Sequence, residues 1–297
     1  MNAQGGPVDQ AEGLRQLAAK GRLGRAPLRV FAVTSGKGGV GKTNCTANLA
    51  VLAAKAGKRV LVLDADLGLA NVEILLGIKP KHHIGDLLYK GVSLDDVIVA
   101  GPHGIHLLPA GSGVQSLTDL ADEEKMHLIN SLDSLEDRFD VVFIDTGAGI
   151  GDNVMFFAGA AQESILVVSP EPTSLVDAYA AVKVLSQDAG VSRFAVLVNP
   201  VVDELAARDI FPKLTGVASR FLKAKLRLLG YVPRDENVHR AVMHQRAVVD
   251  MFPSAPSARA FASAAERLFD VEGEANLESG LKFMWQRLLR ESQAVAG

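Results

Sequence analysis

Residues 36–43 read Gly-Lys-Gly-Gly-Val-Gly-Lys-Thr. The stretch fits the pattern G-x-x-x-x-G-K-[ST] and lies between a short apolar run, Arg29–Thr34, and a helical pattern that begins at about Lys42. Its glycines let the backbone wrap around phosphate groups with the amide N–H groups pointing inward, and the helix N-terminus adds positive potential. The sequence therefore predicts a phosphate-binding loop, with Lys42 on the β- and γ-phosphates of a nucleotide and the Thr43 hydroxyl on Mg²⁺.

Lys37 is an additional cation in this loop, one residue after its first glycine. It is either a solvated loop lysine or a second cation on the phosphates, reaching them across a dimer in the way that an arginine finger acts in trans. The spacing alone leaves both interpretations open.

Acidic residues follow two of the apolar runs. Asp64 and Asp66 come after Val60–Leu63, and Asp145 comes directly after Val141–Ile144. Ligands of open α/β sheets bind at the carboxyl ends of the strands, where these side chains are expected. Asp145 is predicted to hold Mg²⁺ through water, because Mg²⁺ keeps several of its waters. Asp64 or Asp66 is predicted to orient an attacking water, and the alternative for each acid is a helix cap or a turn.

Apolar runs alternate with helical patterns through residues 28–271, which predicts a doubly wound, mostly parallel α/β sheet with helices on both faces. The predicted strands are Arg29–Thr34, Arg59–Leu63, Gly104–Leu108, Val141–Ile144, Ile165–Val168, Phe194–Val198 and Leu228–Val232. The predicted helices include Lys42–Ala56, Asp122–Leu135, Leu175–Asp188, Glu204–Lys223 and Ser257–Phe269.

Composition narrows the class of protein. The 297 residues are 48% hydrophobic and carry a net charge of −3, but no apolar run reaches the roughly 18 residues that a transmembrane helix needs. The acidic balance argues against a strongly basic nucleic-acid coat. Cys45 is the single cysteine, which excludes an intrachain disulfide and a multi-cysteine metal cluster. With no secretory signal visible, we expect a cytoplasmic protein.

Residues 1–27 are predicted to form a flexible arm that carries a short helix at residues 9–20. Asp9 is a possible N-cap, Glu12 stands three residues later as in a capping box, and Gly21 ends the pattern. A helix this short is marginal alone in water, so it docks or waits for a partner.

Residues 272–297 are predicted to form a linker, Glu272–Asn276, and an amphipathic helix at about Leu277–Glu291. A helix with Trp and Leu on one face and basic residues towards the other can lie in a membrane interface. Alternatively it packs on the domain or across a dimer contact, and the two can alternate with ATP. The predicted membrane residues are Leu281, Met284, Trp285 and Leu288.

Three segments around the predicted site resemble the MinD/ParA family of deviant Walker A ATPases. Lys37–Thr43 resembles its Walker A motif, Leu63–Asn71 its switch I, and Asp145–Asp152 its Walker B and switch II. Gly147 and Gly151 stand where MinD itself usually has Pro and Glu, a form similar to the flagellar branch, FlhG or FleN. The resemblance covers about residues 28–270 and includes 171–174, 215–222 and 231–249.

The resemblance implies a slow, switch-like ATPase that uses ATP and Mg²⁺ and dimerises face to face. It implies that Lys37 reaches the partner's phosphates, that Asp66 aligns the hydrolytic water, and that Asp64 lies beside the magnesium shell. The implied catalytic residues are Lys37, Lys42 and Asp66, and the implied metal site is Thr43, Asp64 and Asp145. The implied nucleotide contacts are Gly36, Lys37, Gly38, Gly39, Val40, Gly41, Lys42, Thr43 and Asn44, with adenine contacts from Asn199, Pro233 and Asp235.

The resemblance also implies a function and partners. The flagellar branch regulates the number and placement of polar flagella, acting reversibly at the inner membrane. Asp9–Arg15 resembles that branch's DQAxxLR element, which implies contact with the GTPase FlhF through Gln10 and Arg15. Flagellar switch or C-ring proteins and a σ54-dependent flagellar activator are further implied partners, whereas direct DNA binding is not expected.

Four alternatives share parts of this pattern. Nitrogenase-type iron proteins have the phosphate loop but need two cysteines per subunit, and this chain has one. ParA-type DNA-segregation ATPases bind DNA through basic surfaces, against which the acidic balance and the apolar terminal helix argue. A MinD-type division-site regulator is closer, although Asp9–Arg15 and the Gly147/Gly151 form favour the flagellar branch. A nucleotide-gated scaffold with hydrolysis as a timer is compatible with that branch.

Overall fold

The computed structural model describes residues 27–66, 71–109, 131, 135, 137–222 and 224–270. The predicted arm, apart from Pro27, and the predicted linker and terminal helix lie outside the described residues. The same holds for Gln10 and Arg15, for the four predicted membrane residues, and for all of the predicted helix Asp122–Leu135 except Ser131 and Leu135.

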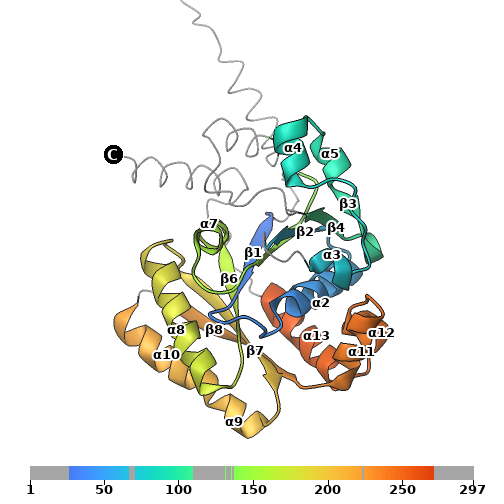
Figure 1. The fold of residues 1–297 in the computed structure, drawn as a ribbon. Coiled ribbons are helices and arrows are strands. Elements are labelled where there is room, and N and C mark those ends of the chain that lie inside the picture. The colour runs from blue at the N-terminus through green and yellow to red at the C-terminus, as the bar shows by residue number, and fades with distance from the viewer. Residues whose placement is uncertain are drawn as a thin grey trace, which may run out of the picture.

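An eight-stranded sheet runs through the middle of the molecule in the order β3-β4-β2-β5-β1-β6-β7-β8 (Figure 1). Neighbouring strands pair in parallel except β3 and β4, which are antiparallel, so the predicted mostly parallel sheet is confirmed. The strands are β1 Arg29–Thr34, β2 Val60–Ala65, β3 Val99–Ala100, β4 His106–Pro109, β5 Val141–Thr146, β6 Glu163–Val168, β7 Arg193–Val201 and β8 Lys225–Pro233.

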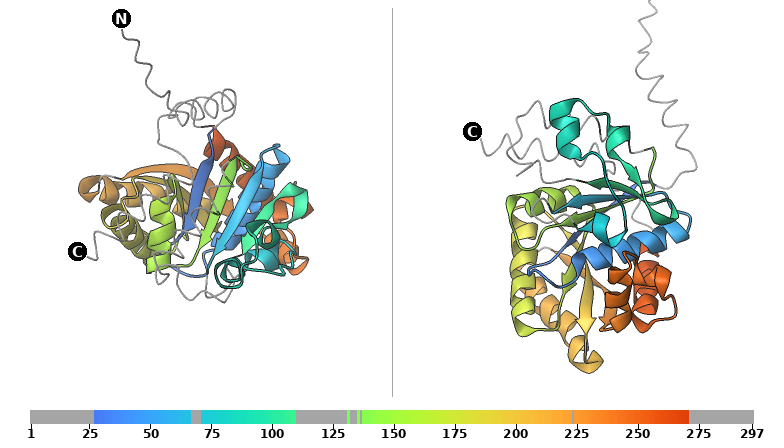
Figure 2. Two further views of the ribbon diagram at one scale, coloured as in Figure 1. Left: turned by 90° about the horizontal axis from the view of Figure 1, so that it is seen from above. Right: turned by 45° about the vertical axis from the view of Figure 1, so that its right-hand side comes forward.

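Helices cover both faces of the sheet, and the right-hand view of Figure 2 shows the strands between the yellow-green α8 and the blue α2 with the orange-red α13. No helix in the described part of the chain is long and apolar enough to cross a bilayer. The helices are α2 Lys42–Lys55, α3 Val72–Leu75, α4 Ile84–Lys90, α5 Leu94–Val97, the 3-10 turn η1 Pro102–Gly104, α7 Asp152–Ala160, α8 Pro172–Gln187, α9 Glu204–Arg208, α10 Ile210–Phe221, α11 Glu236–Met243, α12 Val248–Met251 and α13 Pro256–Phe269.

The central strand β1 is buried on both sides, which explains its unbroken apolar sequence. Phe31 and Val33 pack into the cluster that includes α2 and α13. Ala32, one residue out of phase, packs into the cluster of α7, α8 and α10. The alternation of a strand therefore places consecutive apolar residues in two separate cores.

The predicted helix Glu204–Lys223 is wrong as a single element, because it is two helices, α9 and α10. Pro212 explains the break. A continuous helix would need a hydrogen bond from residue 212 to the carbonyl of Arg208, and proline has no N–H and its ring clashes there. In the first turn of α10 the same proline is tolerated.

Candidate nucleotide-binding site

The predicted phosphate loop connects β1 to α2 at the carboxyl edge of the sheet. β1 lies between β5 and β6, near the middle of the strand order, so the loop occupies the edge where open α/β sheets bind ligands. Gly39 and Gly41 have φ angles of 78° and 89°, a left-handed conformation that glycine adopts without steric cost. The backbone of the loop thus depends on Gly41, which the pattern fixes, and on Gly39, which stands at one of its variable positions.

Two glycines of the loop are also required by close packing. A Cβ on Gly36 would lie 2.2 Å from the backbone carbonyl of Asp177 in α8. A Cβ on Gly41 would lie 2.5 Å from Nδ2 of Asn199, which donates a hydrogen bond of 2.8 Å to the carbonyl of Val40. The loop is therefore held between α8 and the end of β7.

Lys42, the first residue of α2, is 9% exposed. Burial lowers the pKa of its ammonium group, and the nearby carboxylates of Asp145 and Asp66 act in the opposite direction. The cation thus faces the carboxylates of the predicted magnesium and water sites at the start of the helix.

Asp145 is the second-last residue of β5, lies beside the same helix and is buried. Thr46 Oγ1 donates a hydrogen bond of 2.8 Å to its carboxylate, and the Thr43 hydroxyl is hydrogen-bonded to it as well. Burial raises the pKa of Asp145 to about 6, against the opposing effect of these hydroxyls. The fold therefore brings together Thr43 and Asp145, two of the predicted metal ligands.

Asp64 is the register neighbour of Asp145 on the adjacent strand β2 and is fully buried. Burial, and then the charge of Asp145, raise the pKa of its carboxyl to about 7. Its oxygens accept hydrogen bonds from the backbone N–H groups of Asp66, Asn71 and Val72 at 3.2, 3.1 and 3.2 Å. The alternative of a helix cap is thus present in the geometry, because Asp64 satisfies amides at the start of α3.

The residues present fit a magnesium ion. Two buried carboxylates on neighbouring strands repel each other when both are ionised, and a cation between them removes that cost. With the Thr43 hydroxyl they form the kind of oxygen set that Mg²⁺ prefers. Among the residues that the structure describes, no three His, Cys, Asp or Glu side chains are grouped as metal ligands. Because Mg²⁺ is usually bound through one or two carboxylates, an ion here would keep several of its waters.

Asp66 stands at the carboxyl end of β2, opposite the segment that follows β5. A Cβ on Gly147 would lie 3.9 Å from Asp66 Oδ1, an ordinary contact. Gly149 donates its N–H to the carbonyl of Ser35 at 2.9 Å, which ties this segment to the phosphate loop. A Cβ on Gly151 would meet no atom within 4 Å. Packing within the described residues therefore does not require glycine at positions 147 and 151.

Lys37 is paired within its own chain. Its Nζ lies 2.9 Å from Oε2 of Glu171, at the start of α8, and the two side chains are 43% and 61% exposed. The hydrogen bond to Glu171 raises the pKa of the lysine. The prediction that Lys37 reaches a second copy's phosphates stays a prediction, and in one chain its partner is Glu171.

A hollow of about 580 Å³ lies beside the phosphate loop. The predicted residues Asn44, Asn199, Pro233 and Asp235 all line it, so residues far apart in the sequence meet beside the glycines. The remaining wall was not predicted from the sequence. It comes from α11, α13 and neighbouring residues: Pro200, Arg234, Glu236, Val238, His239, Val242 and Phe261.

The Asp235 side chain already has protein partners. Its Oδ1 accepts a hydrogen bond of 2.9 Å from the backbone of Asn237 and caps α11. Its Oδ2 accepts hydrogen bonds of 3.1 and 2.8 Å from the backbone and hydroxyl of Ser257, at the start of α13. Asp235 thus positions the two helices that complete the wall of the hollow.

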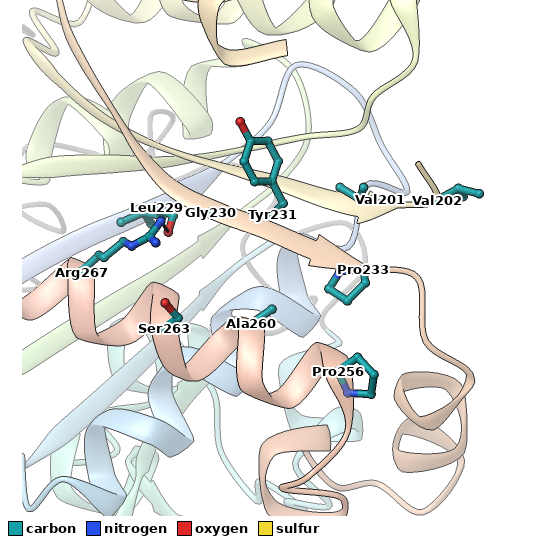
Figure 3. Close-up of a pocket in the computed structure, with 10 residues that line it drawn as sticks. All are labelled: Val201, Val202, Leu229, Gly230, Tyr231, Pro233, Pro256, Ala260, Ser263 and Arg267. Carbon is teal, nitrogen blue, oxygen red and sulfur yellow. Dashed lines mark hydrogen bonds between the residues drawn. The ribbon is translucent and has the colours of Figure 1, made fainter. Parts of the chain in front are cut away.

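A second hollow, of about 480 Å³, lies between β8 and α13 (Figure 3). It shares Pro233 with the hollow at the phosphate loop. At its other end Arg267 Nη1 donates a hydrogen bond of 3.0 Å to the carbonyl of Leu229. Of the predicted nucleotide residues it contains Pro233 alone, so the hollow at the loop is the candidate site.

Comparison with known proteins identifies the family. The sequence profile of the CobQ/CobB/MinD/ParA nucleotide binding domain matches residues 31–248. The chain belongs to this family. It is 46% identical to the Antiactivator FleN of Pseudomonas aeruginosa over 264 residues, which are 89% of this chain and 94% of FleN. It is 30% identical to the Flagellum site-determining protein YlxH of Helicobacter pylori, over 88% of this chain and 90% of YlxH.

A solved structure of the same family shares the fold. The septum site-determining protein MinD from Pyrococcus horikoshii, complexed with Mg-ADP, superposes with a TM-score of 0.66 at 27% identity and covers 84% of this chain and 98% of that one. The predicted resemblance to MinD/ParA nucleotide-binding proteins of the flagellar kind is confirmed.

Proposed function

We propose that this chain is an ATP-hydrolysing switch that regulates the number and placement of polar flagella. The observation that carries the proposal is the 46% identity to Antiactivator FleN across 89% of the chain. The grouping of the phosphate loop with Asp64, Asp66 and Asp145 at one sheet edge supports the ATPase part of it.

The proposed nucleotide site is the loop and the adjoining hollow. Backbone amides of Gly36–Asn44 cradle the phosphates, and Lys42 neutralises the β- and γ-phosphates. Asn199, Pro233 and Asp235 lie around the adenine. A bound Mg²⁺ supplies charge neutralisation at the phosphate oxygens, and Thr43, Asp145 and Asp64 would hold it.

Asp66 is the proposed residue that orients the attacking water, because its carboxylate follows β2 at the same edge as Lys42 and Asp145. Orientation of the nucleophile is the main task left to the protein in phosphoryl transfer. Asp66→Ala should therefore bind ATP and remain trapped in the dimer, with turnover lost. An Asp66→Ala protein that hydrolyses ATP at the normal rate contradicts this role.

The proposed active form is a face-to-face dimer. Lys37 then leaves Glu171 and reaches the phosphates of the second copy. The Lys37–Glu171 pair is exposed, and exposed ion pairs contribute little to stability, so its opening is a small obstacle beside the charge of a triphosphate. Nucleotide binding and dimer closure are thereby linked through one lysine.

The proposed domain organisation is an arm at residues 1–27, an ATPase domain at 28–271 and a membrane-associating segment at 272–297. Gln10 and Arg15 of the arm are proposed to act on FlhF, and C-ring proteins and a σ54-dependent activator are proposed partners. Leu281, Met284, Trp285 and Leu288 are proposed to attach the ATP-bound form reversibly to the inner membrane at the pole. Unchanged liposome binding after deletion of residues 277–297 contradicts the attachment.

A division-site regulator is the second candidate, because the chain shares its fold with MinD of Pyrococcus horikoshii. The two are separated by counting polar flagella and mapping septa in cells that lack the gene, with the wild-type gene returned as a control. We expect an altered number of flagella and normal septa. Unchanged flagella with misplaced septa would favour the division-site function.

A further inference from the structure

The end of α13 lies on the start of β1, at the edge of the sheet opposite the phosphate loop. Phe269, the last residue of α13, packs edge-on against Phe31 with the ring centroids 6.1 Å apart. Two cations lie against the same ring: the guanidinium of Arg29 is 5.7 Å from its centroid and Lys58 Nζ is 5.0 Å from it. We call Arg29, Lys58 and the Phe269 ring the Phe269 surface.

The carboxylates near these two cations are already paired with other arginines. Glu163, whose negative charge interacts with Arg29 at longer range, accepts hydrogen bonds of 2.6 and 2.7 Å from Arg227. Asp140, whose negative charge interacts with Lys58 at longer range, accepts hydrogen bonds of 2.9 and 3.1 Å from the backbone N–H and Nε of Arg59.

Neither Arg29 nor Lys58 forms an ion pair with another described residue. Both are half-buried, so part of their hydration is lost without a counter-charge in contact. The Phe269 surface therefore carries positive charge in excess.

The chain that continues from this surface is acidic. The residues after Phe269 are Asp270, Val271, Glu272, Gly273 and Glu274. Further on comes Glu278, and the first cation is Lys282.

The spacing of these acids suits contact with the surface. Asp270, Glu272 and Glu274 recur every second residue, which places them on one side of an extended chain. At about 3.3 Å per residue, Glu272 is within roughly 10 Å of Phe269 along the chain.

We propose that the acidic segment 270–274 docks on the Phe269 surface, with Glu272 and Glu274 paired to Arg29 and Lys58. The segment that follows is then held at the edge of the sheet away from the nucleotide, beside the point where the N-terminal arm joins β1. Because exposed ion pairs are screened, docking weakens as salt rises. The docking does not involve the nucleotide-binding site, so its test is independent of the ATPase proposal.

Zero-length carbodiimide coupling of the full-length protein tests the contact, because it joins a lysine to a carboxylate only where the two meet. The expected product is an amide between Lys58 and Glu272 or Glu274, found by peptide mass mapping at low salt and lost at high salt. The Lys90–Asp86 pair, 2.6 Å apart, is the internal positive control. Exposed Lys183, which has no ion pair with another described residue, is the negative control.

Variants exclude a coincidental product. Lys58→Arg keeps the charge but cannot couple, and Glu272→Gln with Glu274→Gln removes the acceptors, so each should abolish the product. In a second measurement, a Glu-specific protease should cleave within 270–276 roughly fivefold faster in Lys58→Glu, the factor expected from losing an exposed pair and adding a repulsion. Lys183→Glu should leave that rate unchanged.

Two results would overturn the proposal. One is coupling of Lys90 to Asp86 while Lys58 couples to neither glutamate and Lys58→Glu does not alter cleavage. The other is a product that joins isotopically labelled to unlabelled chains in a mixed sample, since that would place the acidic segment on a second copy.

Discussion

The two ends of α2 hold carboxylates in opposite surroundings. At its first turn, Asp64 and Asp145 are buried side by side, and burial raises their pKa values to about 7 and about 6. Beside its last turn, the carboxylate of Asp250 forms an ion pair of 2.9 Å with Lys55 Nζ and lies 2.7 Å from Nε2 of His103. Arg246 also forms an ion pair with it.

The pKa of Asp250 is held at about 2, because the hydrogen bonds of Lys55 and Arg246 outweigh its partial burial. At the first end of the helix, the negative charges of two buried carboxylates are unfavourable, and a bound cation would stabilise them. At the other end, the negative charge of Asp250 is neutralised by basic side chains of the protein. Perturbed carboxyls of the first kind are typical of functional sites, whereas those of the second kind stabilise the fold.

Substitution of the lysine at each end of α2 by alanine gives the largest expected difference, which is in ATP affinity. Lys42→Ala should lower ATP affinity by at least roughly a hundredfold, since it removes the only lysine that the motif directs at the β- and γ-phosphates. Lys55→Ala should leave that affinity unchanged and lower the free energy of unfolding by about 0.5 kcal/mol, as a partly exposed pair is lost. Equilibrium titration with a fluorescent ATP analogue and urea unfolding measure the two effects. Normal ATP turnover by Lys42→Ala would refute the site assignment.

The glycines that flank α2 differ in the reason for their presence. Gly36→Ala puts a methyl group 2.2 Å from the backbone of α8, so we expect a loss of roughly 2–3 kcal/mol in stability and a displaced loop. Gly57 has a φ of 81° and open space around it, so Gly57→Ala should cost about 1 kcal/mol through backbone strain alone. Urea unfolding compares them, with Gly151→Ala as the control expected to be neutral. A loss for Gly36→Ala no larger than that for Gly57→Ala would show that the close approach to α8 is not rigid.

Removal of the two kinds of charge should change stability in opposite directions. Without ligand at pH 7, Asp145→Asn should raise the free energy of unfolding by roughly 1 kcal/mol, because a buried charge with a raised pKa opposes folding. Asp250→Asn should lower it by roughly 1 kcal/mol. Urea unfolding measures both changes. Two changes of the same sign would contradict the assignment of opposite electrostatic surroundings to Asp145 and Asp250.

The acid limb of the stability curve is the smallest effect expected. The folded pKa of Asp250, about 2, lies below its ordinary value of 3.8, so its contribution is complete above about pH 4 and is lost as pH falls through 2. The difference between wild type and Asp250→Asn should therefore shrink between pH 4 and pH 2, as followed by urea unfolding. A difference that stays constant over this range would mean that the Asp250 charge is not the cause.

The sheet could be predicted from sequence because each central strand is buried on both faces and reads as an unbroken apolar run. The two-residue strand β3 could not, because it is too short to leave a pattern. The break between α9 and α10 left a signal in Pro212, and the helical pattern on both sides obscured it.

The candidate site likewise has a part that could be predicted from sequence and a part that could not. The phosphate loop and the acids at the carboxyl ends of β2 and β5 are local in sequence and were predicted, and the structure gathers them at one edge. The wall formed by His239 and Phe261 has no motif, because tertiary packing alone brings α11 and α13 to the loop. The pairing of Lys37 with Glu171, 134 residues apart, likewise depends on the fold.

We propose that the carboxylates at the first turn of α2 are prepared for a cation that accompanies the nucleotide. Calorimetric titration of ATP into the wild type and Asp145→Asn, with and without Mg²⁺, tests it directly. We expect Mg²⁺ to strengthen ATP binding to the wild type by roughly tenfold or more and to have little effect on Asp145→Asn. Equal dependence on Mg²⁺ in the two proteins would contradict it.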